Sequence, residues 1–394
     1  MDIGSEERSG NEIAPKSQLI YDPAVFVTHG GYQIVFLTRD RCLAWVKTGD
    51  GEYSDDESGN IRSDRTVHKI FVDGEVLDRA GEYTIVFAKT INRDPYFPSS
   101  GEKEERMYSF RPVTKKDGYK LFMLCDTHML EAEPVETAKY YGDDLDALIL
   151  NGDISEASDC TDSLFRIHRI IEGITHGTLP VVCARGNHDT RGEAALDYPL
   201  YVPTDDDSGR LYYSFRLGSI WGLVLDCGED KEDSDEEYGG MANFDPYRAA
   251  ETRFLAKIAA NAEKEYAAPD VKYRIAVCHI PLEFYGRKSE YFTKHYSKWL
   301  SYLDSMKLDI MLCGHRHRMD FMPAGHECGS GFAGYATVVG GSRKETDLPD
   351  GNKADDMNGT ALELSEGDIR VIFTDGSHGI LGEHIQKTRD RLGE

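Results

Sequence analysis

Four short polar clusters in this sequence combine aspartate, asparagine and histidine, and each follows an apolar run. They are Asp126-Thr127-His128, Gly152-Asp153, Gly186-Asn187-His188-Asp189 and Gly314-His315-Arg316-His317. A fifth signal, His279, follows the apolar run at 274–278. Carboxylate, amide and imidazole groups in these proportions suit two metal ions bound side by side. The residue types therefore predict a dinuclear metal site.

The polar clusters are positioned by the segments that precede them. From about residue 115 onward, short apolar runs alternate with helix-like segments, and such runs are typical of strands buried on both faces. The runs are 121–125, 147–150, 179–183, 221–225, 275–278 and 310–313. In an open α/β sheet, side chains that follow the carboxyl ends of the strands meet at one edge. A single polar residue there is commonly a structural cap, whereas five such signals in succession predict a shared site.

Capping signals and periodicity predict the remaining elements of this region. Asp245 and Pro246 suit the cap and the first position of a helix that runs to about Tyr266. A second helix is expected over 295–306, and strands are expected over 336–339, 360–364 and 369–373. The acid-rich insert 229–237 is expected to be an exposed loop.

The first part of the chain has a different pattern. Residues 1–17 predict a flexible leader, and residues 18–114 predict a small β-sandwich, because short β-rich runs alternate with turn signals such as Asp73-Gly74. The β-rich runs are 24–28, 32–37, 42–46, 67–72 and 83–88. Residues 111–114 are interpreted as the linker to a second domain, 115–394.

Composition narrows the class of protein. The 394 residues are 40% hydrophobic and 29% charged, which is ordinary for a globular protein. No apolar stretch approaches 18 residues, so no membrane span is expected. The first 16 residues lack the apolar core of a signal peptide, which favours a cytoplasmic protein unless a leader has been removed.

Charge and cysteine content add two further constraints. The formal net charge of −25 argues against a general nucleic-acid-binding protein, because it repels phosphates at long range. Bound cations reverse the field locally, so a phosphorylated substrate stays compatible with this charge. The eight cysteines follow neither a zinc-type spacing nor a disulfide framework. Those at 125, 183, 278 and 313 are expected to be buried thiols of a protein in a reducing compartment.

The ordered set of clusters resembles the calcineurin-like metallophosphoesterase family. The family pattern is D-x-H, G-D-x-x-D, G-N-H-D/E, a lone H and G-H-x-H, and the resemblance covers roughly residues 118–375. It implies an α/β fold, a four-layer α/β/β/α sandwich. A preceding small all-β sandwich of fibronectin or immunoglobulin type is similar to the arrangement in purple acid phosphatases.

The resemblance also implies a role for each polar residue. Asp126, His128 and His317 would hold one metal ion, Asn187, His279 and His315 would hold a second, and Asp153 would bridge both. The two ions implied are divalent or trivalent Mn, Fe or Zn, which carboxylate and imidazole ligands suit. An extended backbone would send imidazoles two residues apart to opposite sides, so His315 and His317 need a bent loop to serve two metals.

The chemistry implied is phosphoester hydrolysis. A water that bridges two such metals loses a proton near neutral pH and attacks phosphorus in line. His188 matches the family's non-ligand histidine and is expected to protonate the leaving oxygen or to stabilise its charge. Glu156 stands where many relatives carry aspartate, and it is expected either to accept a hydrogen bond from His188 or to be a surface residue in a first helical turn.

Departures from the family pattern argue against two of its branches. Ala157 occupies the position where protein phosphatases of this family carry arginine, which argues against a phosphoprotein phosphatase. Purple acid phosphatases have a tyrosine ligand after the Gly-Asp motif and lack the first histidine, whereas this chain has Glu156 and His128. The charge-transfer site of that branch is therefore not expected.

Two pairs of residues keep two interpretations each. Arg185 and Arg316 either contact a phosphate oxygen or pair with acidic neighbours. Phe284 and Tyr285 either line a pocket or pack in the core.

The sequence as a whole predicts a metal-dependent phosphatase or phosphodiesterase that acts on a small phosphorylated molecule. A nuclease of the same fold and a non-catalytic metal-binding scaffold are the alternatives. The sequence leaves the metal identities, the preference between monoesters and diesters, and the oligomeric state open.

Overall fold

The computed structural model describes residues 17–49, 51–55, 62, 64–205, 208–282, 290–328, 331–347 and 353–390, without the side chains of 290–293, 331, 345–347 and 353–355. Residues 1–16 of the predicted leader, together with Phe284 and Tyr285, lie outside the described residues.

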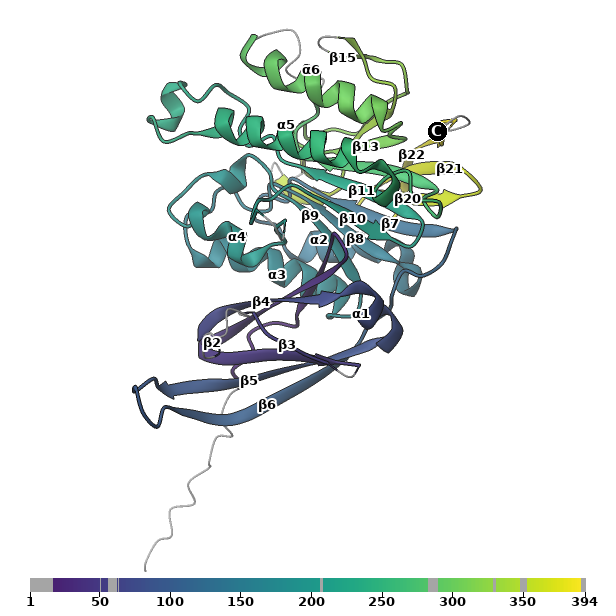
Figure 1. Cartoon of the computed structure of the whole chain (residues 1–394). Helices are drawn as coiled ribbons and strands as arrows, with labels where there is room; N and C mark the ends of the chain where they lie inside the picture. The colour runs from purple at the N-terminus through teal and green to yellow at the C-terminus, as the bar shows by residue number, and fades with distance from the viewer. Residues whose placement is uncertain are drawn as a thin grey trace, which may run out of the picture.

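Two large β-sheets organise the described part of the chain (Figure 1). The first sheet has 12 strands in the order β22-β21-β20-β7-β8-β9-β1-β2-β5-β6, with β3 and β4 also paired to β2. Its strands are β1 Ala24–Thr28, β2 Gly31–Thr48, β3 Gly51–Tyr53, β4 Arg65–Asp73, β5 Glu82–Asn92, β6 Ser99–Ser109, β7 Tyr119–Leu124, β8 Ala147–Asn151, β9 Pro180–Ala184, β20 Gly359–Ser365, β21 Asp368–Thr374 and β22 Ile380–Lys387.

The second sheet has six strands in the order β10-β11-β12-β13-β17-β14. These strands are β10 Tyr213–Leu217, β11 Ile220–Leu225, β12 Tyr273–Cys278, β13 Ile310–Cys313, β14 Asp320–Met322 and β17 Ala336–Val339. Two further antiparallel pairs lie in the described residues, β15 Glu327–Cys328 with β16 Gly331–Phe332 and β18 Arg343–Asp347 with β19 Lys353–Met357.

The central strands are mainly apolar because each is covered on both faces. In β7, Leu121 and Met123 join a core cluster shared with the second sheet, whereas Phe122 and Leu124 join a cluster that also contains helix residues. Successive side chains of a strand point to opposite faces, so an uninterrupted apolar run is what a doubly covered strand requires.

Helices cover the outer faces of both sheets. They are α2 Ala132–Thr137, α3 Thr161–Thr175, α4 Tyr198–Tyr201, α5 Phe244–Ala260 and α6 Glu290–Ser305, whereas α1 Gly74–Ala80 packs Leu77 into the core cluster shared with the second sheet. Leu164, Ile167 and Ile171 of α3 recur at helical spacing and pack on the first sheet. Leu255 of α5 and Trp299 of α6 pack on the second sheet, and Figure 1 shows these two helices side by side above it. The predicted four-layer α/β/β/α arrangement with an N-terminal β region is confirmed.

The N-terminal strands extend the first sheet of the α/β region. β1 pairs in parallel with β9, where Val25 faces Pro180 and Phe26 faces Val181. One face of β2, β4 and β5, with Ile34, Ile70 and Ile85, belongs to the core cluster that also contains residues of the second sheet. The two predicted runs 32–37 and 42–46 form one long strand, β2, and its pairing with β4 is irregular between Leu37 and Cys42. The predicted boundary near residue 114 stays a prediction.

Two local features differ in detail from the sequence prediction. Asp73-Gly74 separates β4 from β5, as predicted, but it does so by starting a helix, because the Asp73 carboxylate accepts hydrogen bonds from the amides of Glu75 and Val76 and so caps α1. Asp245 does not cap α5, which begins one residue earlier and ends at Ala260. Its carboxylate instead lies 2.7 Å from Nε2 of His295 on α6.

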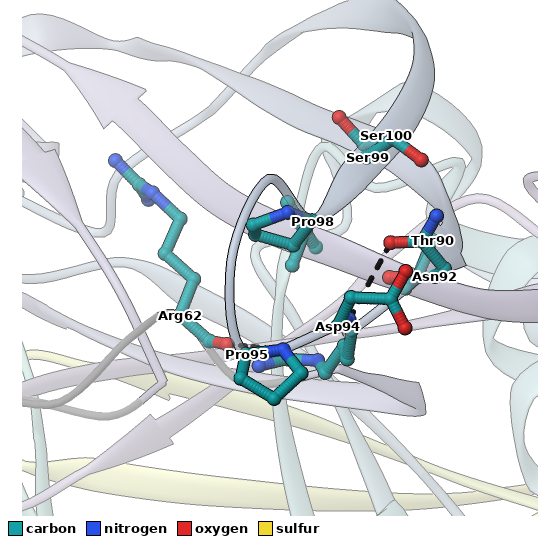
Figure 2. Close-up of a pocket in the computed structure, with 10 residues that line it drawn as sticks. Arg62, Thr90, Asn92, Asp94, Pro95, Pro98, Ser99 and Ser100 are labelled. Carbon is teal, nitrogen blue, oxygen red and sulfur yellow. Dashed lines mark hydrogen bonds between the residues drawn. The ribbon is translucent and has the colours of Figure 1, made fainter.

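A hollow of about 400 Å³ lies at the turn between β5 and β6 (Figure 2). Figure 2 shows Pro95 and Pro98 in this turn, and Arg93 donates to the Asp64 carboxylate at 3.0 Å. The turn also carries two highly exposed aromatic residues, Tyr96 and Phe97. No helix in the described ranges is both long enough and apolar enough to cross a bilayer.

Candidate metal centre

The predicted ligand residues meet where strands of the two sheets end. Asp126 and His128 follow β7, Asp153 follows β8, and Asn187 follows β9 in the first sheet. His279 follows β12, while His315 and His317 follow β13 in the second sheet. The pairs β7–β8, β8–β9 and β12–β13 are all parallel, so within each sheet these residues come from one edge.

Two glycines allow the loops to approach closely enough to share a site. Gly152 has a φ of +78°, and a Cβ there would lie 2.4 Å from the backbone nitrogen of Gly186. A Cβ on Gly186 would lie 2.1 Å from Oδ1 of Asp153. The glycines of the two motifs are therefore required because the loops after β8 and β9 touch through their backbones.

Several candidate ligands have left-handed backbone conformations, which determine the direction of their side chains. The φ angles that fall in this region are 50° at Asp126, 40° at His128, 53° at Asp153, 70° at His315 and 46° at His317. Such conformations cost of order 1–3 kcal/mol each in non-glycine residues and cluster at functional sites. The positive φ angles at His315 and His317 bend the Gly-His-x-His segment, as is required if its two imidazoles are to serve two metal ions.

Asp126, His128 and His317 form the first candidate ligand group. Nε2 of His128 and Nε2 of His317 lie 3.0 Å apart. Oδ1 of Asp126 lies 3.9 and 3.5 Å from these two nitrogens. Two ligand atoms that each lie about 2.1 Å from one ion can be at most roughly 4.2 Å apart, so all three separations are compatible with a shared metal ion.

Asp153, His279 and His315 form the second candidate group. Nε2 of His279 is buried without a hydrogen-bond partner and lies 3.0 Å from Oδ2 of Asp153. The other ring nitrogen of His279 lies 2.6 Å from the carbonyl oxygen of Asn151, which holds the ring in place. Nδ1 of His315 lies 2.8 Å from Oδ1 of Asn187, so the amide joins this group. An orphaned buried nitrogen beside a carboxylate fits a site for a cation.

The electrostatics of the centre also favour a cation. Burial opposes protonation of His279, but Asp153 and Asp126 outweigh it and raise its pKa to about 10. Burial and the neighbouring Asp153 raise the pKa of the Asp189 carboxyl to about 6. A site that holds positive charge on His279 at neutral pH is one where a metal ion would replace that proton.

Asp189 ties two ligand loops together. Its Oδ2 accepts hydrogen bonds from the backbone amides of Asp153 and Gly186, each at 2.9 Å. The sequence pattern includes this residue without indicating what it contacts. Its contacts fix the Asp153 loop against the Asn187 loop.

His188 is held by the main chain rather than by a carboxylate. Its Nδ1 lies 2.8 Å from the carbonyl oxygen of Glu156, whereas the carboxylate of Glu156 lies 3.9 Å away. The hydrogen bond expected between His188 and that carboxylate is therefore replaced by one to the backbone. An Nδ1–H that donates to this carbonyl leaves Nε2 for a substrate. The Glu156 carboxylate lies 3.4 Å from Nδ1 of His128, and His128, Glu156 and His188 form a third group that could hold an ion.

The acid-rich insert is not exposed at its start, contrary to the prediction. Glu229 is 1% exposed and accepts from the Arg191 guanidinium at 2.9 Å and from the Tyr238 hydroxyl at 3.0 Å. Since Arg191 follows the Asn187 loop, this ion pair brings the insert to the candidate metal centre. The burial of Glu229 depends on Arg191, which is distant in sequence, so the run of acids does not itself indicate that Glu229 is buried.

Of the two interpretations of Arg185, the structure supports pairing with an acidic neighbour. Its Nη2 lies 2.9 Å from Oδ2 of the fully buried Asp226, and its guanidinium lies over the ring of Tyr247. Such a pairing holds the start of the Asn187 loop and places Arg185 among structural residues.

Asp230 is a carboxylate near the centre that the sequence did not single out. Its Oδ2 lies 3.7 Å from Nε2 of His315, and its Oδ1 is buried without a partner. Because Nδ1 of His315 faces Asn187, Nε2 is the nitrogen that a second carboxylate could orient.

We expect Asp230→Asn to weaken metal binding about 10- to 100-fold, the usual effect of removing a group that orients a metal ligand. Competition with a chromophoric chelator measures this affinity. Glu236→Gln, which removes an exposed charge from the same insert, is the matched control and should leave the affinity unchanged. Equal affinities for Asp230→Asn and the parent would contradict the orienting role.

An open cavity of about 520 Å³ lies over the centre. It is lined by His128, Glu156, His188, His317, Arg343 and Lys344. The two cationic residues belong to no motif in the sequence, and only the course of the chain after β17 brings them here.

The fold and the converging ligands define a metal-dependent phosphoesterase. Residues 124–319 match the family model described as calcineurin-like phosphoesterase. This segment is a calcineurin-like phosphoesterase domain, and the chain is a metal-dependent phosphoric ester hydrolase. A comparison with curated proteins found no match.

Solved structures with a similar fold include a purple acid phosphatase and PhoD. A purple acid phosphatase from yellow lupin (Lupinus luteus) seeds is 13% identical, and the match covers 93% of this chain and 73% of that chain with a TM-score of 0.58. PhoD is 11% identical, and the match covers 95% of this chain and 90% of that chain with a TM-score of 0.52. At these identities the similarity concerns the fold.

Proposed function

We propose that this protein hydrolyses phosphoric monoesters or diesters of a small molecule at a dinuclear metal centre. Asp126, His128 and His317 would hold one ion, Asn187, His279 and His315 the other, and Asp153 would lie between them. The observation that carries the proposal is the convergence of three donors in each candidate group, with orphaned His279 Nε2 beside Asp153. The metals proposed are Mn, Fe or Zn, whose ligand preferences match this donor set.

The chain's own groups have distinct tasks in this reaction. Bound metal ions would supply an acidic water and offset the charge of the phosphate. His188, held through Nδ1 by the carbonyl of Glu156, would present Nε2 to the leaving oxygen and donate a proton there. The backbone amide of His188 donates to Oδ1 of Asp153 at 2.8 Å, so the proton donor is fixed relative to the carboxylate proposed as the bridge.

The charge of the protein supports a small substrate. A net charge of −25 opposes the approach of a long polyanion, while a cavity of about 520 Å³ suits one phosphate ester. We also propose a cytoplasmic location and a division of the chain into two domains, 18–114 and 115–394. All eight cysteines are thiols that form no disulfide in the described residues, which is compatible with a reducing compartment.

The deciding experiment is a panel of aryl monoesters, aryl diesters, nucleotides and DNA ends, assayed with Mn, Zn and Fe in turn. The proposal expects turnover of small esters and about two metal ions per chain by elemental analysis. Faster hydrolysis of DNA ends at low salt would favour the nuclease. Two bound metals without turnover on any substrate would favour the non-catalytic scaffold.

Metal removal should affect stability as well as activity. Dialysis against a chelator is expected to abolish hydrolysis and to lower Tm by about 3 °C, since ions at ~100 times Kd stabilise by about 2.7 kcal/mol. Scanning calorimetry before and after adding back the metal measures this shift. An unchanged Tm together with retained activity would exclude a metal-dependent enzyme.

A further inference from the structure

The segment after β17 brings two cationic residues to the candidate centre. Gly340-Gly341-Ser342 leads from β17 into β18, whose first residues are Arg343 and Lys344. Both line the cavity that His128, His188 and His317 also line. Arg343 is half-buried and Lys344 is exposed, so the first lies deeper and the second lies nearer the rim.

Backbone hydrogen bonds hold this segment against the ends of both sheets. The amide of Cys125 donates to the carbonyl of Gly341 at 2.8 Å, and the amide of Gly340 donates to that of Cys313 at 3.1 Å. Gly341 has a φ of +82°, and a Cβ there would lie 2.8 Å from the carbonyl oxygen of Met123. Only glycine allows the chain to pass this close to β7.

The position of Arg343 is coupled to the first ligand group. Its backbone amide donates to the carbonyl of Asp126 at 3.0 Å. At the other end of the residue, Nη1 lies 3.4 Å from the carbonyl oxygen of His128. Arg343 is therefore held next to Asp126 by its backbone and next to His128 by its guanidinium. Both of these neighbours are proposed to hold a metal ion.

The chain has no arginine where protein phosphatases of this family carry one, because Ala157 occupies that position. Arg343 brings a guanidinium to the cavity over the candidate centre from the start of β18. Arginine presents several donors in a fixed plane and suits a phosphate oxygen pair, whereas lysine acts as a point charge.

We propose that Arg343 binds a non-bridging phosphate oxygen and that Lys344 faces the outer negative charge, so the site selects phosphomonoester dianions over phosphodiester monoanions. This inference rests on the proposed phosphoesterase function. A monoester at neutral pH carries one more negative charge than a diester, and two cations at the open side of the cavity favour the more highly charged ligand.

The test compares Arg343→Gln, Arg343→Lys and Lys344→Gln, each loaded with metal. Arg343→Gln should lower kcat/KM for an aryl monoester roughly 10- to 100-fold, the effect of losing a charge-assisted hydrogen bond, and should lower it for an aryl diester far less. Lys344→Gln should lower the monoester value about 2- to 5-fold, because its charge is exposed. Arg343→Lys should restore part of the preference.

Inorganic phosphate gives a readout that does not depend on turnover. Calorimetry should show phosphate binding weakened in Arg343→Gln, with metal content unchanged by elemental analysis. Lys298→Gln, an exposed lysine on α6, is the control and should bind phosphate like the parent. Equal losses on monoester and diester, or unchanged phosphate affinity in Arg343→Gln, would overturn the inference. A metal-loaded parent protein that hydrolyses neither ester would overturn the proposed function instead.

Discussion

Asp153→Asn should lower phosphoesterase activity by about 10³-fold or more and weaken both metal ions. Oδ2 of Asp153 lies 3.0 Å from His279, and Oδ1 accepts the backbone amide of His188. An amide in place of the carboxylate loses the negative charge that would offset repulsion between two cations, and several kcal/mol of transition-state stabilisation depend on those cations. Steady-state kinetics and metal content measure the two effects.

A matched control is available a few residues along the chain. Asp159 is exposed and follows the same motif, so Asp159→Asn removes one negative charge without touching the centre. It should retain both metals and full turnover. An Asp153→Asn protein that keeps two tightly bound ions would contradict the bridging position.

His188→Ala should keep both metals and reduce kcat about 10²- to 10⁴-fold, the usual contribution of a positioned proton donor. The ring of His188 stands edge-on to that of His128, with centroids 4.9 Å apart, and its Nδ1 faces a backbone carbonyl. Removing it therefore leaves the proposed ligands in place. Elemental analysis alongside kcat separates a proton donor from a ligand.

Glu156→Gln tests whether the orientation of His188 depends on the main chain or on the carboxylate of Glu156. Since the main chain of Glu156 holds His188, the side-chain amide should preserve the orientation of the imidazole and most of the turnover. Metal loss in His188→Ala would instead show that His128, Glu156 and His188 form an ion site, and the assignment of His188 as proton donor would fail.

The candidate ligands could be predicted from local sequence, whereas most of the residues around them could not. Each ligand motif follows an apolar run that becomes a buried strand, and the parallel pairing of β7, β8 and β9 brings their ends together. Local pattern was sufficient because a strand end determines where the next side chains lie. The same reasoning predicted buried thiols at Cys125, Cys183, Cys278 and Cys313, and all four are buried.

What the sequence by itself determined was the class of chemistry and, through the family that its motifs resemble, the four-layer fold, because short motifs after strand-length apolar runs carry that resemblance. The tertiary structure alone showed that β1 extends the first sheet beside β9, that Arg191 buries Glu229, and that Arg343 reaches the cavity from β18. Each of these depends on a partner far away along the chain. Hydrogen bonds and ion pairs between distant segments leave no periodicity in the residues that make them, so only the folded chain decides which cations and carboxylates surround the metal centre.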